Sequence, residues 1–140
     1  MGPRESLNAY LSEIRNRPFK WGEHDCLTFT NEAWHRMYGH GWADDWVGRY
    51  INGGKLIGRQ AFRAELERVD NAITLERAIS NRLQPINYLP PAGALVTTSK
   101  SRRWHTGVAM GISTGRRGVF LSDEGVIYMP LTDIKDAWVP

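Results

Sequence analysis

The chain has 140 residues, of which 41% are hydrophobic and 24% charged, with a formal net charge of +3. A chain of this length can bury one hydrophobic core, so we expect a single domain over residues 1–140. No window approaches the ~18 consecutive apolar residues of a membrane span, and the N-terminus lacks the apolar stretch of a signal peptide, so we expect cytoplasmic synthesis and no membrane span. The single cysteine excludes an internal disulfide, and with it the cross-linked scaffold of a small secreted protein.

Two helices are predicted near the start of the chain. Apolar residues at i, i+3, i+4 and i+7 indicate an opening helix that ends before Pro18; they are Leu7, Tyr10, Leu11 and Ile14. A second helix is predicted over residues 25–38. Asp25 is its expected N-cap, and Gly39 follows its end.

The middle of the chain, about residues 42–90, is predicted to be a helical and loop insertion. Residues 39–58 are rich in glycine and tryptophan and only weakly periodic, so we expect a long loop there. One helix is then predicted through Phe62, Leu66, Val69 and Ile73, and another through Leu75, Ala78 and Ile79 after a Thr74 cap.

The last third of the chain changes to short apolar stretches broken by glycine. These predict strands at about residues 94–98, 105–112, 118–121, 125–129 and 137–139. Helices first and strands afterwards favour an α+β fold, in which N-terminal helices pack on a C-terminal antiparallel sheet of about five strands.

Cys26 is the first candidate for catalysis, because it stands where a glycine turn enters the second predicted helix. The N–H groups of the first turn and the helix dipole stabilise a negative charge, so we expect the pKa of this thiol to lie below the ~8.5 of a free cysteine. We interpret the neighbouring Asp25 as a helix cap rather than a catalytic acid.

His105 is the candidate base, at the start of a predicted strand. Side chains alternate along a strand, so His105 would share a nearly bare face with Gly107, Ala109 and Gly111. We expect the Cys26 helix to pack on that face, which would bring thiol and imidazole together. The alternative is that the small residues accommodate a core aromatic such as Phe29.

Two tryptophans flank the candidate pair, and we expect Trp21 and Trp104 to line a substrate groove. A zinc site made of His24, Cys26 and His105, with Asp25 or Asp123 as fourth ligand, is the competing interpretation. No Cys-x-x-Cys or His-x-x-x-His spacing supports it, so we predict no metal and no cofactor.

Four motifs follow one another along the chain: Trp21-Gly22, Asp25-Cys26, Gly93-Ala94-Leu95-Val96, and His105-Thr106-Gly107-Val108 with Gly111 closing the strand. Together they resemble the NlpC-type papain-like cysteine peptidases. A group of phage-encoded, tail-associated proteins of unknown function is similar too, because its members carry Trp-Gly-x-x-Asp-Cys and end in a piece like Ala137-Trp138. The resemblance implies a papain-like fold.

The resemblance also implies catalytic roles. Cys26 matches the nucleophile and His105 the general base. The third residue that orients the imidazole would be Asp123, which an antiparallel hairpin brings near His105, or Ser122; both also suit an ordinary turn. The family tyrosine that helps to bind the oxyanion is Phe19 here, so His24 or the Cys26 N–H is the candidate donor.

The implied activity is that of a cysteine hydrolase cleaving amide bonds in peptidoglycan stem peptides, assembled with phage tail proteins in a virion tail. One alternative is a catalytically weakened or inactive papain-like scaffold in tail assembly; another keeps the catalytic pair and changes the substrate. The basic residues occur singly or in pairs such as Arg102-Arg103 and Arg116-Arg117, so no nucleic-acid partner is predicted, while the positive balance favours anionic polymers such as cell-wall glycans.

Overall fold

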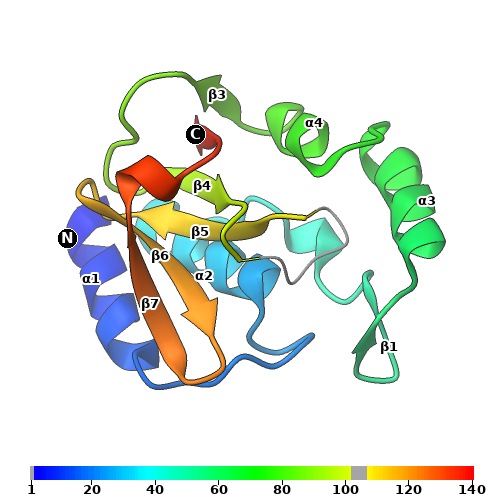
Figure 1. The fold of residues 1–140 in the computed structure, drawn as a ribbon, viewed down its shortest axis with the longest axis horizontal. Coiled ribbons are helices and arrows are strands. Elements are labelled where there is room, and N and C mark those ends of the chain that lie inside the picture. Colours follow the sequence, from blue (N-terminus) through cyan, green and yellow to red (C-terminus); the bar gives the residue numbers. More distant parts are fainter. Residues whose placement is uncertain (1, 102–106) are drawn as a thin grey trace.

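The computed structural model describes residues 2–101 and 107–140. In this part of the chain the fold is α+β (Figure 1). The helices are α1 (Pro3–Ile14), α2 (Cys26–Tyr38), α3 (Arg59–Asp70) and α4 (Leu75–Ser80), with 3-10 turns η1 (Asp44–Trp46) and η2 (Leu131–Asp133). The strands are β1 (Ile51–Asn52), β2 (Lys55–Leu56), β3 (Gln84–Ile86), β4 (Leu95–Thr98), β5 (Ala109–Ser113), β6 (Arg117–Ser122), β7 (Gly125–Pro130) and β8 (Ala137–Val139).

The first two helices lie where the sequence predicts them. Pro3 is at the first position of α1, where its missing N–H costs nothing. α2 begins with a capping box, in which Asp25 and Thr28 each bond the other's backbone N–H. It ends at Gly39, whose φ of 84° is the left-handed conformation that closes helices.

The helices of the middle segment are confirmed with one correction. α3 buries Phe62 and Leu66 as expected, but it ends at Asp70 and does not reach Ile73, which is 68% exposed. Asn71 stops the helix by adopting a left-handed conformation with φ 52°. Thr74 then caps α4, accepting a hydrogen bond from the Arg77 N–H at 3.2 Å.

The main sheet has six antiparallel strands among the described residues, in the order β3-β8-β4-β5-β6-β7. The prediction of about five strands omits β3, which is short and contains Pro85 at a sheet edge where a missing N–H is tolerated. The predicted loop over residues 39–58 also contains η1 and the small β1–β2 hairpin.

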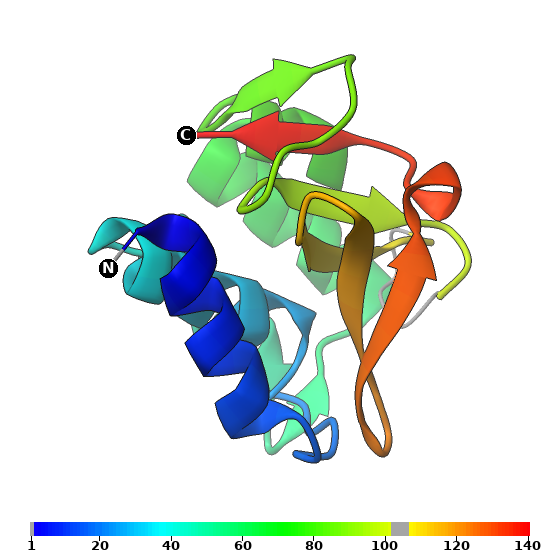
Figure 2. The same cartoon turned by 90° about the vertical axis from the view of Figure 1, so that its left-hand side faces the viewer.

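Helices α1 and α2 pack against one face of the sheet (Figure 2). The main hydrophobic core lies between them and includes Cys26, Phe29, Met110 and Ile112. A smaller cluster lies on the other face and includes Ala94, Val96, Ala109, Phe120 and Ala137. None of the described helices is both long enough and apolar enough to span a membrane.

The bare strand face does not pack on α2, so that expectation is wrong. β5 starts only at Ala109, because Gly107 has a φ of +77° that no strand adopts. Val108, Met110 and Ile112 belong to the core cluster of α2, so Ala109 and Gly111 point to the opposite side. A Cβ on Gly111 would lie 2.7 Å from Phe120 ring atoms, so the small residues accommodate this aromatic rather than Phe29.

Candidate active site

The start of α2 is organised around the carboxylate of Asp25, which is fully buried. It accepts hydrogen bonds from the backbone N–H groups of Gly22 at 2.8 Å, Leu27 at 3.0 Å and Thr28 at 2.9 Å. A buried carboxylate is tolerated only when such donors replace the lost water. The interpretation of Asp25 as a helix cap is therefore confirmed.

Tyr50 completes this network from residues 39–58, a segment in which the sequence singles out no site residue. Its hydroxyl lies 2.8 Å from Oδ1 and 2.6 Å from Oδ2 of Asp25, and donates its proton to that carboxylate. Burial raises the pKa of Tyr50 far above its usual range, and the charges of Asp25 and Cys26 raise it further. Tyr50 thus stays protonated, within electrostatic range of the Cys26 sulfur.

Cys26 is the first residue of α2, and its side chain is 3% exposed. Its thiol belongs to the main core cluster, and its carbonyl accepts a 2.7 Å hydrogen bond from the Thr30 hydroxyl. The helix N-terminus favours a thiolate here, whereas the Asp25 carboxylate next to it disfavours one. A cation near Cys26 would shift this balance towards the thiolate.

The remaining members of the predicted pair and groove are only partly described. His105 and Trp104 lie outside the described residues. Val108, three positions after His105, is 2% exposed and shares the core cluster of Cys26. Trp21 is half-buried and makes edge contacts with the rings of Phe19, at 4.9 Å between centroids, and Tyr50, at 6.5 Å.

His24 directly precedes the Asp25 cap of α2 and is 4% exposed. Its ring packs near Phe29, 6.4 Å between centroids, and lines a shallow groove with Arg17, Thr28 and Asn31. Thr28 and Asn31 lie roughly opposite Cys26 around the helix. Burial lowers the pKa of His24, with a further contribution from Arg17, and its buried Nε2 has no hydrogen-bond partner among residues 2–101 and 107–140.

Ser122 is engaged in the turn between β6 and β7. Its hydroxyl donates to the Gly125 carbonyl at 2.7 Å and accepts from the Glu124 N–H at 3.2 Å. This is the turn chemistry that the sequence allows as the alternative for Ser122. The Phe19 N–H donates to the Ser122 carbonyl at 3.3 Å, so this strand end adjoins the segment that leads to Cys26.

Asp123 is exposed in the same turn. The register of the β5–β6 hairpin pairs Ile112 with Val119 and Ser113 with Gly118. If this register continues, Asp123 falls opposite Val108 rather than opposite His105, so the simple hairpin argument misplaces it by three residues.

The competing zinc site involves His105 and is therefore described only in part. Among residues 2–101 and 107–140, no three His, Cys, Asp or Glu side chains lie together in a group that could hold a metal ion. Cys26 forms no disulfide.

Comparison with known proteins identifies a family. None of the curated proteins matches this sequence. A family model described as "Domain of unknown function (DUF6950)" matches residues 3–139, which is almost the whole chain. The chain therefore belongs to the DUF6950 family.

Proposed function

We propose that this protein is a cysteine hydrolase with a papain-like, NlpC-type fold, which cleaves amide bonds in peptidoglycan stem peptides. The observation that carries the proposal is Cys26 as the first residue of α2, a helix that packs against β5, the strand following His105 in the chain. The α+β architecture, with helices on an antiparallel sheet, is consistent with this fold class.

The chemistry assigns one step to each partner. The Cys26 sulfur attacks the amide carbonyl carbon and forms a C–S bond, while His105 takes the thiol proton and passes it to the leaving amine. Water then hydrolyses the thioester, releasing the carboxylic acid and restoring the thiol. The Cys26 N–H is the proposed oxyanion donor, a role worth about 3 kcal/mol in the barrier.

The network around Asp25 supports this chemistry by positioning the nucleophile. Asp25 ties the turn before the helix, at Gly22, to the first helical turn, at Leu27 and Thr28. A nucleophile held by a rigid shell needs less reorganisation in the transition state. Tyr50 adds a hydrogen bond to Asp25 from the middle segment, which ties that segment to the start of α2.

A second function is favoured by one observation, the 3% exposure of Cys26. A thiol so enclosed suits an inactive papain-like scaffold that serves as a structural protein in phage tail assembly. Under both proposals the protein is associated with a phage tail. The support for this association is the resemblance of the Trp21-Gly22 and Asp25-Cys26 motifs to phage-encoded proteins.

Release of peptide fragments from purified peptidoglycan distinguishes the two functions. The hydrolase should release fragments, Cys26→Ala and His105→Ala should each abolish the release, and His40→Ala, an exposed histidine beyond the end of α2, should leave it unchanged. If Cys26→Ala released peptide fragments as fast as the wild type, the assignment of Cys26 as the nucleophile would be refuted. Rapid alkylation of Cys26 near pH 7 in the folded protein supports activation, whereas a thiol that hardly reacts supports the scaffold.

A further inference from the structure

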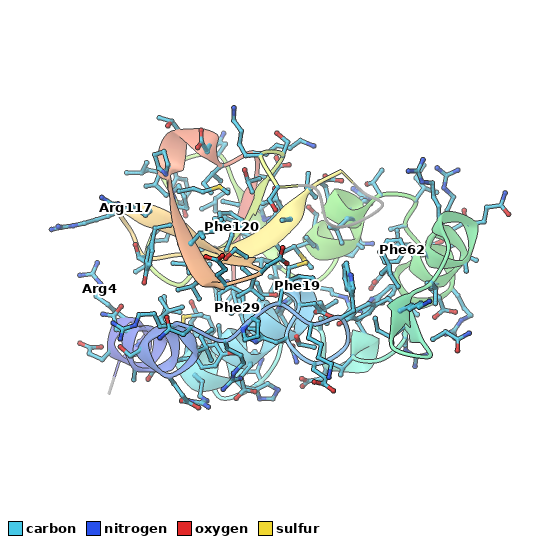
Figure 3. The ribbon with its side chains drawn as sticks, turned by 60° about the horizontal axis from the view of Figure 1, so that its bottom comes forward. Arg4, Phe19, Phe29, Phe62, Arg117 and Phe120 are labelled. Carbon is cyan, nitrogen blue, oxygen red and sulfur yellow. The ribbon has the colours of Figure 1, made fainter. Side chains whose placement is uncertain are left out.

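A groove of ≈ 600 Å³ lies between α1 and the turn that joins β5 to β6. We name it the arginine groove; its lining includes Asn8, Ser12, Arg15, Arg116, Arg117 and Tyr128. Arg4 stands beside it, because its guanidinium lies 3.5 Å from where a Cβ on Gly115 would be. Figure 3 shows Arg4 and Arg117 at the same end of the molecule.

The groove follows from the periodicities of two elements. Arg4, Asn8 and Arg15 recur at helical spacing, so they lie along one side of α1. On β6, Arg117 shares the helix-facing side with Val119, which is buried in the main core. Tyr128 pairs with Val119 across the β6–β7 ladder and therefore faces the same way. Arginines far apart in the sequence thus meet at one place.

The charge of the groove is not neutralised by the described protein. No carboxylate lines it, and its arginines form no ion pair with any residue in the described ranges. Other arginines of the chain do, such as Arg36 with Glu13 at 2.9 Å and Arg82 with Asp70 at 2.8 Å. Like charges gathered without a partner raise the local potential and attract an anionic ligand.

The lining indicates the chemistry of that ligand. Guanidinium groups bind phosphate oxygens with two parallel hydrogen bonds, and all charged groups of the groove are arginines. Tyr128 is 49% exposed and offers a ring on which a base can stack. A positively charged groove with an aromatic ring is the arrangement by which proteins hold single-stranded nucleic acid. We propose that the arginine groove binds a single-stranded nucleic acid.

α1 forms one wall of the groove and the β5–β6 turn the other. From Arg4 to Arg15 the helix advances about 16 Å, room for several consecutive phosphates. The groove lies at the Arg117 end of β6, about 17 Å from the Ser122 end that adjoins the Cys26 segment. This binding site is therefore separate from the candidate active site and independent of the proposed hydrolase function.

The test is the fluorescence anisotropy of a labelled ten-nucleotide oligothymidylate, titrated with the full-length protein at several KCl concentrations. Each phosphate contact contributes about 0.7 to the slope of log K against log salt, so Arg15→Gln/Arg117→Gln should reduce the slope by about 1.4. The matched control Arg59→Gln/Arg63→Gln removes the same charge from α3 and should leave the slope unchanged. Tyr128→Ala should weaken binding at least about fivefold, and Tyr128→Phe should not.

Four results would overturn the proposal: no binding, equal weakening by the α3 control, tighter binding of a duplex of the same sequence, or displacement by polyphosphate as effective as by unlabelled oligothymidylate. The last result would mean that the groove binds phosphate without regard to bases. Circular dichroism verifies that each variant folds. If the double variant does not, Arg116→Gln in the exposed turn takes its place, with an expected slope reduction of about 0.7.

Discussion

Replacing Tyr50 by phenylalanine tests the buried network at the start of α2. The change removes only the hydroxyl, which lies 2.6 Å and 2.8 Å from the two Asp25 oxygens, and leaves the ring in place. Hydrogen bonds to a charged group contribute about 1.5–3 kcal/mol. Three backbone donors to Asp25 remain, so we expect Tyr50→Phe to cost about 2 kcal/mol in the free energy of unfolding.

Urea denaturation measures this loss, and thermal unfolding should show a midpoint lower by about 6 °C for a chain of this size. The control is Tyr128→Phe, an exposed tyrosine that should change stability by less than about 0.5 kcal/mol. In a double-mutant cycle, Tyr50→Phe and Asp25→Asn should couple by at least about 1 kcal/mol. Additive effects, or a Tyr50→Phe cost no larger than that of the control, would refute the network as described.

The stability difference between the wild type and Tyr50→Phe should also depend on pH. The folded-state pKa of Tyr50 is raised above the value near 10 of an unfolded chain, so the folded protein retains a proton that the unfolded chain loses. The stability that the hydroxyl provides is fully present below pH ~10 and is lost as the pH rises above it. The stability difference between wild type and Tyr50→Phe should therefore narrow above pH ~10, and a constant difference would contradict the assignment.

Three further changes test other parts of the structure. The folded-state pKa of His24 is lowered, so the contribution of His24 to folding stability is present above pH ~6.5 and is lost as the pH falls. His24→Gln should therefore flatten the decline of stability below that pH, which urea titrations at a series of pH values would reveal. Gly111→Ala should cost about 1–3 kcal/mol, because the new methyl collides with the Val119 carbonyl oxygen on β6 and with the Phe120 ring; a neutral result in thermal unfolding would mean that β5 presents its other face there. Arg82→Ala should cost about 2 kcal/mol, because it leaves the nearly buried Asp70 carboxylate without its guanidinium partner, and chemical denaturation showing no loss would mean that this pair contributes nothing.

The parts of the fold that depend on neighbouring residues are predictable from the sequence. Asp25 and Gly39 mark the ends of α2 because a cap and a left-handed glycine act within one helical turn. The alternation of side chains along β5 can also be predicted from the sequence, but which of its two faces packs on α2 cannot. Gly107, with its positive φ, makes the strand start later than the apolar pattern indicates, at Ala109.

The parts that depend on distant residues could not be predicted. Nothing near Tyr50 in the sequence indicates that its hydroxyl reaches Asp25, because that contact exists only once the middle segment packs on α2. The arginine groove has the same origin, since Arg4 and Arg15 lie along α1 whereas Arg117 lies on β6. For the candidate site, the sequence correctly places Cys26 at a helix start, while the positions of His24 and Asp123 depend on packing and register.

The position of β8 between β3 and β4 has a consequence for the order of folding. β3 pairs only with β8 among the described strands, and the same C-terminal segment holds α4 through the 2.9 Å hydrogen bond from Trp138 to Ser80. The segment from α3 to β3 is thus held to the sheet by residues far along the chain. Contacts between residues that are widely separated in sequence form late in folding. We expect α3, α4 and β3 to open together as one cooperative unit, with amide protons that exchange faster than those of β4 to β7.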